Sequence, residues 1–270
     1  MTPTKIRRAI LIAAGRGKRL GTHTDEMPKS MVAVGPRPIL GWVWDAFRLA
    51  GIEELVVIRG YRGDVLEDFV TKLVPSVTFV DNDDWQTNNV LLSLAKARAF
   101  LDQPCLISYS DIIFTPAVAR AAVESPADIG LVIDRDFRSI YEGRTEHPLD
   151  EGEVADLMPD GSVARVGKRA LPPAEAIGEF IGLSKLSERG VAAVARTLDK
   201  VAQDYAGRET EPFQRAATYR NAYLTDLWQL MIDSGIRIDP VLVDGQWREI
   251  DTGQDLERAR VLVQSAPEWS

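Results

Sequence analysis

Short apolar runs alternate with helical periodicity along the first half of the chain. Apolar residues that recur every three or four positions predict helices at 39–50, 64–73, 89–101 and 116–124. Continuous runs rich in Val, Ile and Leu predict buried strands at 6–13, 54–59, 77–80, 105–109 and 128–133. This alternation predicts an α/β fold with a Rossmann-like, mainly parallel sheet flanked by helices.

The pattern becomes polar after residue 133 and is interrupted by proline and glycine up to about residue 173. Such punctuation predicts a smaller lid of hairpins and loops beside the sheet. Beyond it, strand-like runs lie at 179–183, 237–243 and 247–250, and helical ones at 188–203, 221–234 and 254–263. The chain therefore returns to the sheet after the lid.

The loops that follow three of the predicted strands are candidates for a common site. In open α/β sheets, ligands bind beyond the carboxyl ends of the strands, where the strand order reverses. The loops after Ala13, Val80 and Tyr109 leave the sheet at such ends. We therefore expect these three loops to meet.

Length, charge and cysteine content exclude several classes of protein. A chain of 270 residues favours one large domain with an insertion. A formal net charge of -8 argues against nucleic acid as a main partner. No apolar run approaches the roughly 20 residues of a membrane span, and the basic, apolar start is too short for a signal peptide. Cys105, the only cysteine, predicts a buried strand thiol in a cytoplasmic protein.

The first strand runs into a glycine-rich basic loop. Gly15 and Gly17 permit backbone angles that are closed to other residues, so successive N–H groups can converge on an anion. Positive charge near this loop comes from Arg16, Lys18, Arg19 and Lys29. The pattern is typical of a loop that handles phosphate.

The spacing favours neither of the two common phosphate-binding loops. A Walker A loop has four residues between its first glycine and the Gly-Lys pair, whereas one residue separates Gly15 from Gly17 here. A dinucleotide fingerprint requires a small residue where Leu20 stands, and an acidic residue near 36–40, where there is none. A plain strand-to-helix turn with solvated cations stays open as an alternative.

Two aspartates follow predicted strands and are candidate metal ligands. Asp111 comes shortly after the strand at 105–109, and Asp251 closes the run 247–250. Mg²⁺ takes oxygen ligands and commonly binds one or two carboxylates together with substrate phosphates. Alternatively, each aspartate forms a turn or a helix cap, and Asp251-Thr252 can cap the closing helix.

A polar, amide-rich loop at 81–89 leads into a predicted helix. Asparagine side chains offer paired donors and acceptors that suit a pyrimidine edge. The alternative is an ordinary loop in which Thr87 or Asn88 caps the helix.

Taken together, these segments resemble the nucleotidyltransferases that activate sugar phosphates and phosphocholine. The matching blocks are 11–19 with 28–29, 86–89 with 93–94, 110–111, 167–168 with 171–173 and 178–183, and 247–251. They span nearly the whole chain in the right order. The Asn-Asn block and the Gly-Glu-Phe-Ile-Gly-Leu block resemble the subgroup of cytidylyltransferases that act on phosphocholine or small phosphonates.

The resemblance implies a role for each matched residue. It implies Arg19, Lys29 and Lys168 as catalytic residues, Asp111 and Asp251 as Mg²⁺ ligands, and Glu179 on the acceptor side. The implied nucleotide-binding residues are Ala13, Ala14, Gly15, Gly17, Asn88, Asn89 and Ser93. For Lys168 and Glu179, a solvated lysine and a structural ion pair remain alternatives.

The implied domain covers residues 1–270, divided into a nucleotide-binding core at 1–133, an acceptor lid at 134–183, and closing helices with the metal-binding strand at 184–270. In the implied reaction, an acceptor oxygen attacks the α-phosphorus of CTP in line and pyrophosphate leaves. An anionic acceptor needs no general base, and His23 is expected to be solvated.

The acceptor is expected to be a small phosphonate. The segment 134–148 also resembles the phosphonate-activating branch, and its anion-binding side chains are Arg138, Tyr141, Arg144 and His147. Its alternative is a charged surface hairpin. A phosphocholine acceptor instead requires an aromatic box, for which the candidates are Trp85, Phe180, Tyr223, Trp228 and Trp247.

Two further functions stay open at this point. One is a hexose 1-phosphate nucleotidyltransferase, and the other is a catalytically silent, nucleotide-binding regulatory protein. Intact Lys29, Asp111 and Asp251 argue against the second. The sequence does not set the oligomeric state, and a homodimer is compatible with it.

Overall fold

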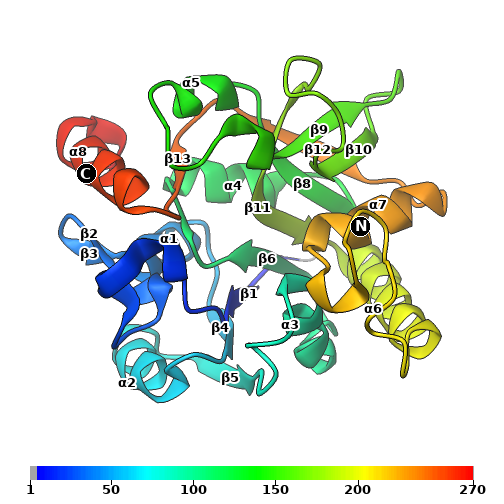
Figure 1. Cartoon of the computed structure of the whole chain (residues 1–270), viewed down its shortest axis with the longest axis horizontal. Coiled ribbons are helices and arrows are strands. Elements are labelled where there is room, and N and C mark those ends of the chain that lie inside the picture. The colour runs from blue at the N-terminus through cyan, green and yellow to red at the C-terminus, as the bar shows by residue number, and fades with distance from the viewer. Residues whose placement is uncertain (1–4, 270) are drawn as a thin grey trace.

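A nine-stranded mixed sheet lies at the centre of the computed structural model, which describes residues 5–269 (Figure 1). The strands of the structure are β1 (Arg8–Ala13), β2 (Ala33–Val34), β3 (Arg37–Pro38), β4 (Glu54–Arg59), β5 (Val77–Asp81), β6 (Cys105–Tyr109), β7 (Ile112–Phe114), β8 (Ile129–Asp134), β9 (Glu153–Leu157), β10 (Val163–Lys168), β11 (Gly178–Leu186), β12 (Asp239–Val243) and β13 (Trp247–Glu249). In the sheet they follow the order β10-β9-β11-β6-β1-β4-β5, with β8 paired to β11 and β12 to β8.

Helices cover both faces of this sheet (Figure 1). The α-helices are α1 (Ile39–Leu49), α2 (Gly63–Leu73), α3 (Val90–Lys96), α4 (Pro116–Glu124), α5 (Phe137–Tyr141), α6 (Glu188–Asp204), α7 (Leu224–Asp233) and α8 (Gly253–Ser265). The 3-10 helices are η1 (Lys18–Thr24), η2 (Lys29–Met31), η3 (Arg98–Phe100), η4 (Leu149–Glu151), η5 (Tyr219–Asn221) and η6 (Pro267–Trp269). No described helix combines the length and the apolar character that crossing a membrane requires.

The parallel part of the sheet aligns the carboxyl ends of four strands, β1, β4, β5 and β6. β1 pairs in parallel with both β4 and β6, and β4 pairs in parallel with β5. The register places Ile12 opposite Tyr109, Ala13 opposite Arg59, and Arg59 opposite Asp81. The predicted α/β class is confirmed, and β11 adds antiparallel pairing to β6, β8 and β9.

Strand β1 is buried on both faces, as its continuous apolar run predicts. Leu11 packs into the cluster that includes α1, α2 and α4, whereas Ile10 and Ile12 pack into the cluster that includes α3, α6 and α7. Cys105 lies in the second cluster, fully buried, so the predicted strand thiol is confirmed. Burial raises the pKa of this thiol to about 12.

Most predicted elements occur within two residues of their expected bounds, with clear exceptions. The helix expected at 89–101 ends at Lys96, because Ala97 leaves helical geometry with φ -90° and ψ 16°, and the chain continues as η3. The helix expected at 221–234 begins only at Leu224, after η5. The lid contains the expected hairpin, β9 with β10, but also the unpredicted helix α5, whose Phe137, Ile140 and Tyr141 are buried.

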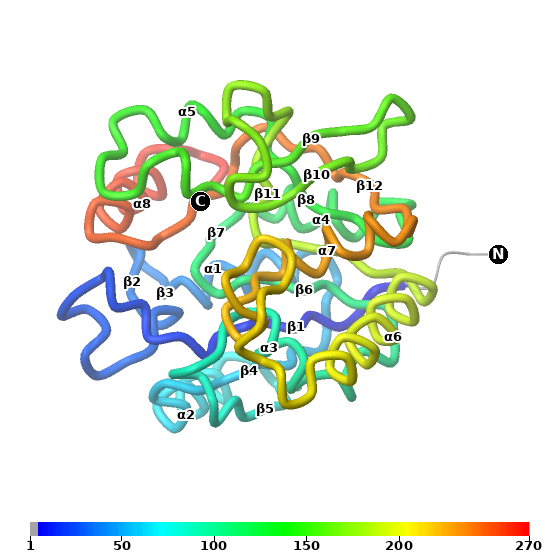
Figure 2. The backbone as a smooth tube through the Cα atoms, turned by 45° about the vertical axis from the view of Figure 1, so that its right-hand side comes forward, coloured from blue at the N-terminus to red at the C-terminus, as the bar shows by residue number. Residues whose placement is uncertain are grey.

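The predicted lid lies at the opposite end of the molecule from α2 and β5. In Figure 2, α5, β9 and β10 lie at the top, and α2 and β5 lie at the bottom. Strand β11, which ends the predicted lid, runs instead within the central sheet between β9, β6 and β8. The strands of the predicted lid, β9, β10 and β11, therefore all belong to the nine-stranded sheet.

A buried aspartate attaches the closing strand β13 to the sheet. β13 pairs antiparallel with β7, with Glu249 opposite Ile112. The fully buried carboxylate of Asp134, at the end of β8, accepts hydrogen bonds from the Trp247 indole at 2.8 Å and from the backbone N–H groups of Gly245 at 2.7 Å and Asp136 at 2.9 Å. This side chain holds the strand that carries Glu249 and Asp251.

We predict that Asp134→Ala lowers the free energy of unfolding by about 3 kcal/mol, because buried N–H donors lose their acceptor. Urea denaturation followed by circular dichroism measures this loss. The matched control is Asp199→Ala, which removes an exposed carboxylate paired with Arg98 and is expected to leave the unfolding free energy near the wild-type value. Equal stability of both variants would contradict the anchoring role of Asp134.

Candidate active site

A pocket of about 400 Å³ lies beyond the carboxyl ends of β1, β5 and β6. The loop after β1 contributes Ala14, Gly15 and Gly17, the loop after β5 contributes Trp85, Asn88 and Asn89, and the loop after β6 contributes Ser110 and Asp111. The three loops that the sequence pattern predicts to meet therefore line one cavity. Ala13 ends β1 and is not part of this lining.

Gly17 allows the glycine-rich loop to approach Lys29. Its φ of 73° lies in the left-handed region, and a Cβ atom there would come within 2.7 Å of Lys29 Cβ. The same residue accepts a backbone hydrogen bond from Leu20 at 3.0 Å, which starts η1. A side chain at this position would therefore strain the backbone and displace the lysine.

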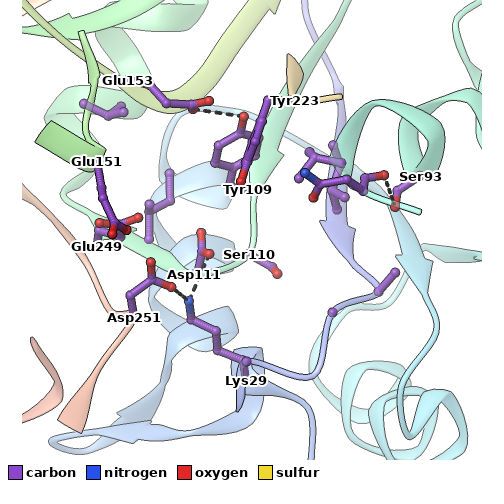
Figure 3. Close-up of a pocket in the computed structure, with 18 of the residues that line it drawn as sticks. Lys29, Ser93, Tyr109, Ser110, Asp111, Glu151, Glu153, Tyr223, Glu249 and Asp251 are labelled. Carbon is purple, nitrogen blue, oxygen red and sulfur yellow. Dashed lines mark hydrogen bonds and ion pairs between the residues drawn. The ribbon is translucent and has the colours of Figure 1, made fainter. Parts of the chain in front are cut away.

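Lys29 lies between the two candidate metal ligands, as Figure 3 shows. Its ammonium is 3.0 Å from Asp111 Oδ2 and also contacts Asp251 Oδ1, and the residue is 7% exposed. Burial alone would lower the pKa of Lys29, but the charges of the two aspartates outweigh it and raise that pKa. The lysine is therefore held as a cation.

Asp251 accepts contacts through both of its oxygens. Besides Lys29 on Oδ1, Arg19 contacts Oδ2, and Arg19 also pairs with Glu151 at 3.3 Å. Burial would raise the pKa of Asp251, but the cations, Lys29 foremost, hold it below its usual range. Asp111 differs, because its Oδ1 is buried and has no hydrogen-bond partner among the described residues.

The donor set around these aspartates fits a hard divalent cation. Both aspartates line the pocket and contact Lys29, Asp111 keeps an unpartnered oxygen, and carboxylate oxygens are the ligands that Mg²⁺ prefers. On the far side of Asp251, ligand atoms of His147, Glu249 and Asp251 lie within 4.8 Å of one another. Burial, followed by the charge of Arg144, lowers the pKa of His147 to about 4, so this imidazole is neutral near pH 7.

Two buried glutamates, Glu153 and Glu179, line the pocket and are called its glutamate wall, whereas Glu249 is only half-buried and lies beside Asp251. Glu153 accepts hydrogen bonds from the Tyr109 hydroxyl at 3.1 Å and from Thr225 at 2.8 Å. Glu179 accepts one from the Tyr141 hydroxyl at 2.7 Å through Oε1, while its buried Oε2 has no partner among the described residues. Burial raises the pKa of Glu153 and of Glu179 to about 7. The pKa of Glu249 is raised well above its usual value, by burial and then by the charge of Asp251.

The amide-rich loop is fixed by a residue that the sequence analysis did not single out. Asn82, 1% exposed, donates hydrogen bonds to Asn88 Oδ1 and Ser93 Oγ, both at 2.9 Å, and accepts one from Asn88 Nδ2 at 2.9 Å. Asn89 donates to the carbonyl of Asn221 at 2.9 Å. The signal for Asn82 was its place directly after β5 at the start of the polar loop.

The structure does not bring the predicted acceptor residues of the lid into the pocket. Arg138 points to the carbonyls of Pro173 and Ala176, at 2.6 and 3.0 Å. Tyr141, Arg144 and His147 are buried beside the pocket but are not part of its lining. The expectation that these four side chains line the acceptor pocket is therefore wrong, and they lie behind or beside its lining instead.

Arg144 is engaged by acidic side chains of the protein. Its guanidinium pairs with Asp255 at 2.7 Å and Glu249 at 2.8 Å, and lies 2.9 Å from His147 Nδ1, with only 2% of its side chain exposed. Asp255 belongs to α8, where it also forms a capping box with Thr252. The expected cap of the closing helix is thus Thr252, not Asp251. Arg144 and Tyr141 hold Glu249 and Glu179, which do line the pocket.

Lys168 and several aromatic residues complete the lining. Lys168, at the end of β10, lies 4.7 Å from the centre of the Tyr223 ring. Four of the five aromatic candidates line the pocket, namely Trp85, Phe180, Tyr223 and Trp247, whereas Trp228 belongs to α7 and is fully buried in the core. His23 is exposed, as expected of a solvated histidine.

Similar proteins are known from several organisms. The chain is 28% identical over 255 residues to the CTP:phosphoglutamine cytidylyltransferase of Campylobacter jejuni, covering 92% of this chain and 97% of the relative. It is 29% identical over 155 residues to the CMP-5'-(3-aminopropyl)phosphonate synthase of Streptomyces rubellomurinus, covering 57% of this chain and 24% of that relative.

The fold is also similar to solved structures. The CTP:phosphocholine cytidylyltransferase from Streptococcus pneumoniae superposes with a TM-score of 0.71 at 18% identity. The superposition covers 96% of this chain and 100% of the pneumococcal chain. The model of the family described as MobA-like NTP transferase domain matches residues 9–237. The chain therefore belongs to the family of MobA-like NTP transferase domains and is a nucleotidyltransferase.

Proposed function

We propose that the protein is a CTP-dependent cytidylyltransferase that transfers CMP to a small phosphonate and releases pyrophosphate. The observation that carries the proposal is the position of Lys29 between Asp111 and Asp251, beside the glycine-rich loop in one pocket. CTP as the nucleotide is supported by two similar proteins, the CTP:phosphoglutamine cytidylyltransferase of C. jejuni, which aligns over nearly its whole length, and the CMP-5'-(3-aminopropyl)phosphonate synthase of S. rubellomurinus.

The proposed reaction needs positioning and charge, and no nucleophile from the protein. The backbone of Gly15 and Gly17 cradles the triphosphate, while Arg19 and Lys29 neutralise charge that develops on the phosphates. Asn88, Asn89 and Ser93 lie at the other end of the cavity, where amide groups can read a pyrimidine edge. The acceptor oxygen is already anionic, so it attacks the α-phosphorus without a general base.

Asp111 and Asp251 are the proposed ligands of Mg²⁺, which when bound polarises the α-phosphate and stabilises the leaving pyrophosphate. In the ligand-free protein Lys29 contacts one oxygen of each of these aspartates. The ammonium must therefore leave at least part of this position before a cation binds both carboxylates. The phosphates of an incoming nucleotide offer Lys29 and Arg19 alternative anionic partners.

The acceptor side is proposed to lie between Lys168 and the glutamate wall. Lys168 provides charge for the acceptor phosphonate, and the unpartnered oxygen of Glu179 provides a site for a cationic tail. Residues 134–183 contribute Lys168, Glu153 and Glu179 to the pocket, which supports their role as the acceptor lid. An aminoalkylphosphonate satisfies both ends of this arrangement.

Phosphocholine is the second candidate acceptor, and the aromatic lining favours it. Phe180, Tyr223 and Trp247 line the same pocket as the buried glutamates. Aromatic faces and carboxylates together bind quaternary ammonium groups. The two acceptors differ in their cation, because a primary ammonium donates hydrogen bonds to Glu179 and a trimethylammonium does not.

The first experiment is a pyrophosphate-release assay with Mg²⁺. CTP, UTP, ATP, GTP and dTTP are each paired with 2-aminoethylphosphonate, phosphocholine and glucose 1-phosphate. We expect release with CTP and the phosphonate. Release with phosphocholine alone supports the second candidate, and release with UTP or dTTP and glucose 1-phosphate contradicts cytidylyl transfer. No release from any pair, with CTP bound, would contradict the proposed phosphonate.

We predict that Lys29→Met tightens binding of a divalent cation to the nucleotide-free protein at least tenfold, because two neighbouring carboxylates lose the ammonium that neutralises them. Free Mn²⁺ is measured by electron paramagnetic resonance. The same variant is expected to lose about a hundredfold or more of CTP turnover. Asp111→Asn is expected to weaken Mn²⁺ binding, and Lys18→Met, a change in an exposed lysine of the same loop, to leave it unchanged. Unchanged Mn²⁺ affinity in Lys29→Met contradicts the competition.

We predict a pH-dependent loss of acceptor affinity in Glu179→Gln. The pKa of Glu179 is raised to about 7, so its carboxylate is mostly neutral at pH 6 and mostly charged at pH 8. The ratio of variant to wild-type KM for 2-aminoethylphosphonate is therefore expected to rise from near one at pH 6 to about ten at pH 8.

Methylphosphonate, which has no ammonium group, is the control for this measurement. Its KM ratio is expected to stay near one across the same pH range. A ratio for 2-aminoethylphosphonate that does not change with pH would remove the assignment of Glu179 to a cationic tail.

A further inference from the structure

A second cavity of about 600 Å³ adjoins the active-site pocket. The two cavities share Asn89, Glu151, Lys168 and Tyr223 in their linings. Lys168 and Tyr223 are the residues that face the proposed acceptor, so the second cavity extends the site on the acceptor side. A small phosphonate in the first pocket leaves this extension empty.

Two arginines in the second cavity have no internal partner. Arg169 follows β10, and Arg215 lies in the long connection between α6 and α7. Both are exposed, and neither guanidinium makes a hydrogen bond or an ion pair with a residue in the described range 5–269. Most other arginines near the site are paired with carboxylates, as Arg19 and Arg144 are.

Arg169 has a backbone conformation that glycine adopts more easily than other residues. Its φ is 55°, in the left-handed region, in a turn where Ala170 donates a backbone hydrogen bond to Gly167 at 3.2 Å. The turn follows Lys168 directly, so the guanidinium of Arg169 is tied to the position of the acceptor lysine. The neighbour of Arg215, Gln214, is also left-handed, with φ 51°.

No carboxylate of the second cavity forms an ion pair with either arginine among the described residues, although the nearby charge of Arg215 offsets part of the rise that burial causes in the pKa of Asp226. Glu151 pairs with Arg19, and Asp226 accepts backbone N–H groups of Tyr223 at 2.8 Å and Arg215 at 3.2 Å. Asp150 lies in the same lining, as a third acidic group. A lining with two available guanidinium groups and a neighbouring carboxylate suits a ligand that carries a carboxylate together with an ammonium.

We infer that the acceptor is a phosphonate or phosphate of an α-amino acid, whose carboxylate binds Arg169 and Arg215 in the second cavity. The phosphorus end lies against Lys168, and the ammonium lies toward Asp150 in the same cavity, which takes the place that Glu179 has for a simple aminoalkylphosphonate. This inference rests on the proposed function and narrows its substrate class. It requires only the order of Lys168, Tyr223 and Arg169 along the two joined cavities.

The test compares two ligands that differ by one carboxylate. 2-Amino-4-phosphonobutanoate carries it, and 3-aminopropylphosphonate is the same chain without it. Isothermal titration calorimetry on the full chain, saturated with α,β-methylene-CTP and Mg²⁺, gives the Kd of each. We expect at least tenfold tighter binding of the amino acid.

The variants Arg169→Gly and Arg215→Ala are expected to abolish that difference and to leave the Kd of 3-aminopropylphosphonate unchanged. Glycine accommodates the left-handed φ, so the first variant removes the guanidinium without straining the turn. The matched control is Arg165→Ala, because Arg165 lies on β10, the strand that Arg169 follows, is exposed and pairs with Asp156 at 2.8 Å outside the second cavity.

Equal affinity for the two ligands overturns the inference, and so does absence of binding by both. Variants that weaken the CTP analogue instead of the amino acid also overturn it, because the arginines would then serve the nucleotide. Pyrophosphate release from CTP is measured separately with the same acceptors. A carboxylate preference without pyrophosphate release removes the proposed reaction and leaves the subsite, whereas release without the preference does the reverse.

Discussion

One backbone hydrogen bond joins the two halves of the site. The N–H of Ile250 donates to the carbonyl of Asp111 at 2.8 Å. This bond continues the antiparallel pairing of β13 with β7, in which Glu249 lies opposite Ile112. Asp111 follows the parallel sheet in the first half of the chain, and Asp251 comes near its end. This contact places the two carboxylates on either side of Lys29, and the proposed metal site depends on it.

Closing the fold in this way concentrates negative charge, which the structure offsets with cations paired to these carboxylates. Glu249 and Asp251 lie near Asp111, and each carboxylate raises the cost of ionising the others. Lys29 and Arg19 neutralise Asp251, and Arg144 neutralises Glu249 and Asp255. Removing a single partner from such a group leaves an uncompensated buried charge, so these ion pairs constrain the closing strand and α8 together.

The acceptor side is organised differently, because its acids are held mainly by hydroxyl groups. Tyr109 and Thr225 donate to Glu153, and Tyr141 donates to Glu179. Burial raises the pKa of Glu153 and of Glu179 to about 7, and the hydroxyl donors offset only part of this rise, whereas ion pairs outweigh burial and hold the pKa of Asp251 low. The two ends of one pocket thus differ in charge state at the same pH, which suits a nucleotide with its cation at one end and a charged acceptor at the other.

The sequence by itself determined the features that are local or periodic. Apolar runs specified the parallel strands, because a strand buried on both faces must be apolar throughout, and the glycine-rich loop specified where phosphate would be handled. Lys29, Asp111 and Asp251 could be named because each lies in a motif or at a strand end. Helix bounds were less well determined where a 3-10 turn follows, as at Ala97, since the apolar spacing continues across the break.

Only the tertiary structure decided which charged residues face the pocket. Arg144 and Tyr141 carry groups that suit an anion, yet their partners Asp255 and Glu179 are distant in sequence, and pairing buried them behind the lining. Asn82, Arg169 and Arg215 gained their places through the folding of the loops around them. Side-chain type gives the chemistry that a residue can perform, but the partner that satisfies its charge is set by contacts across the chain, and those contacts leave no periodic trace in the sequence.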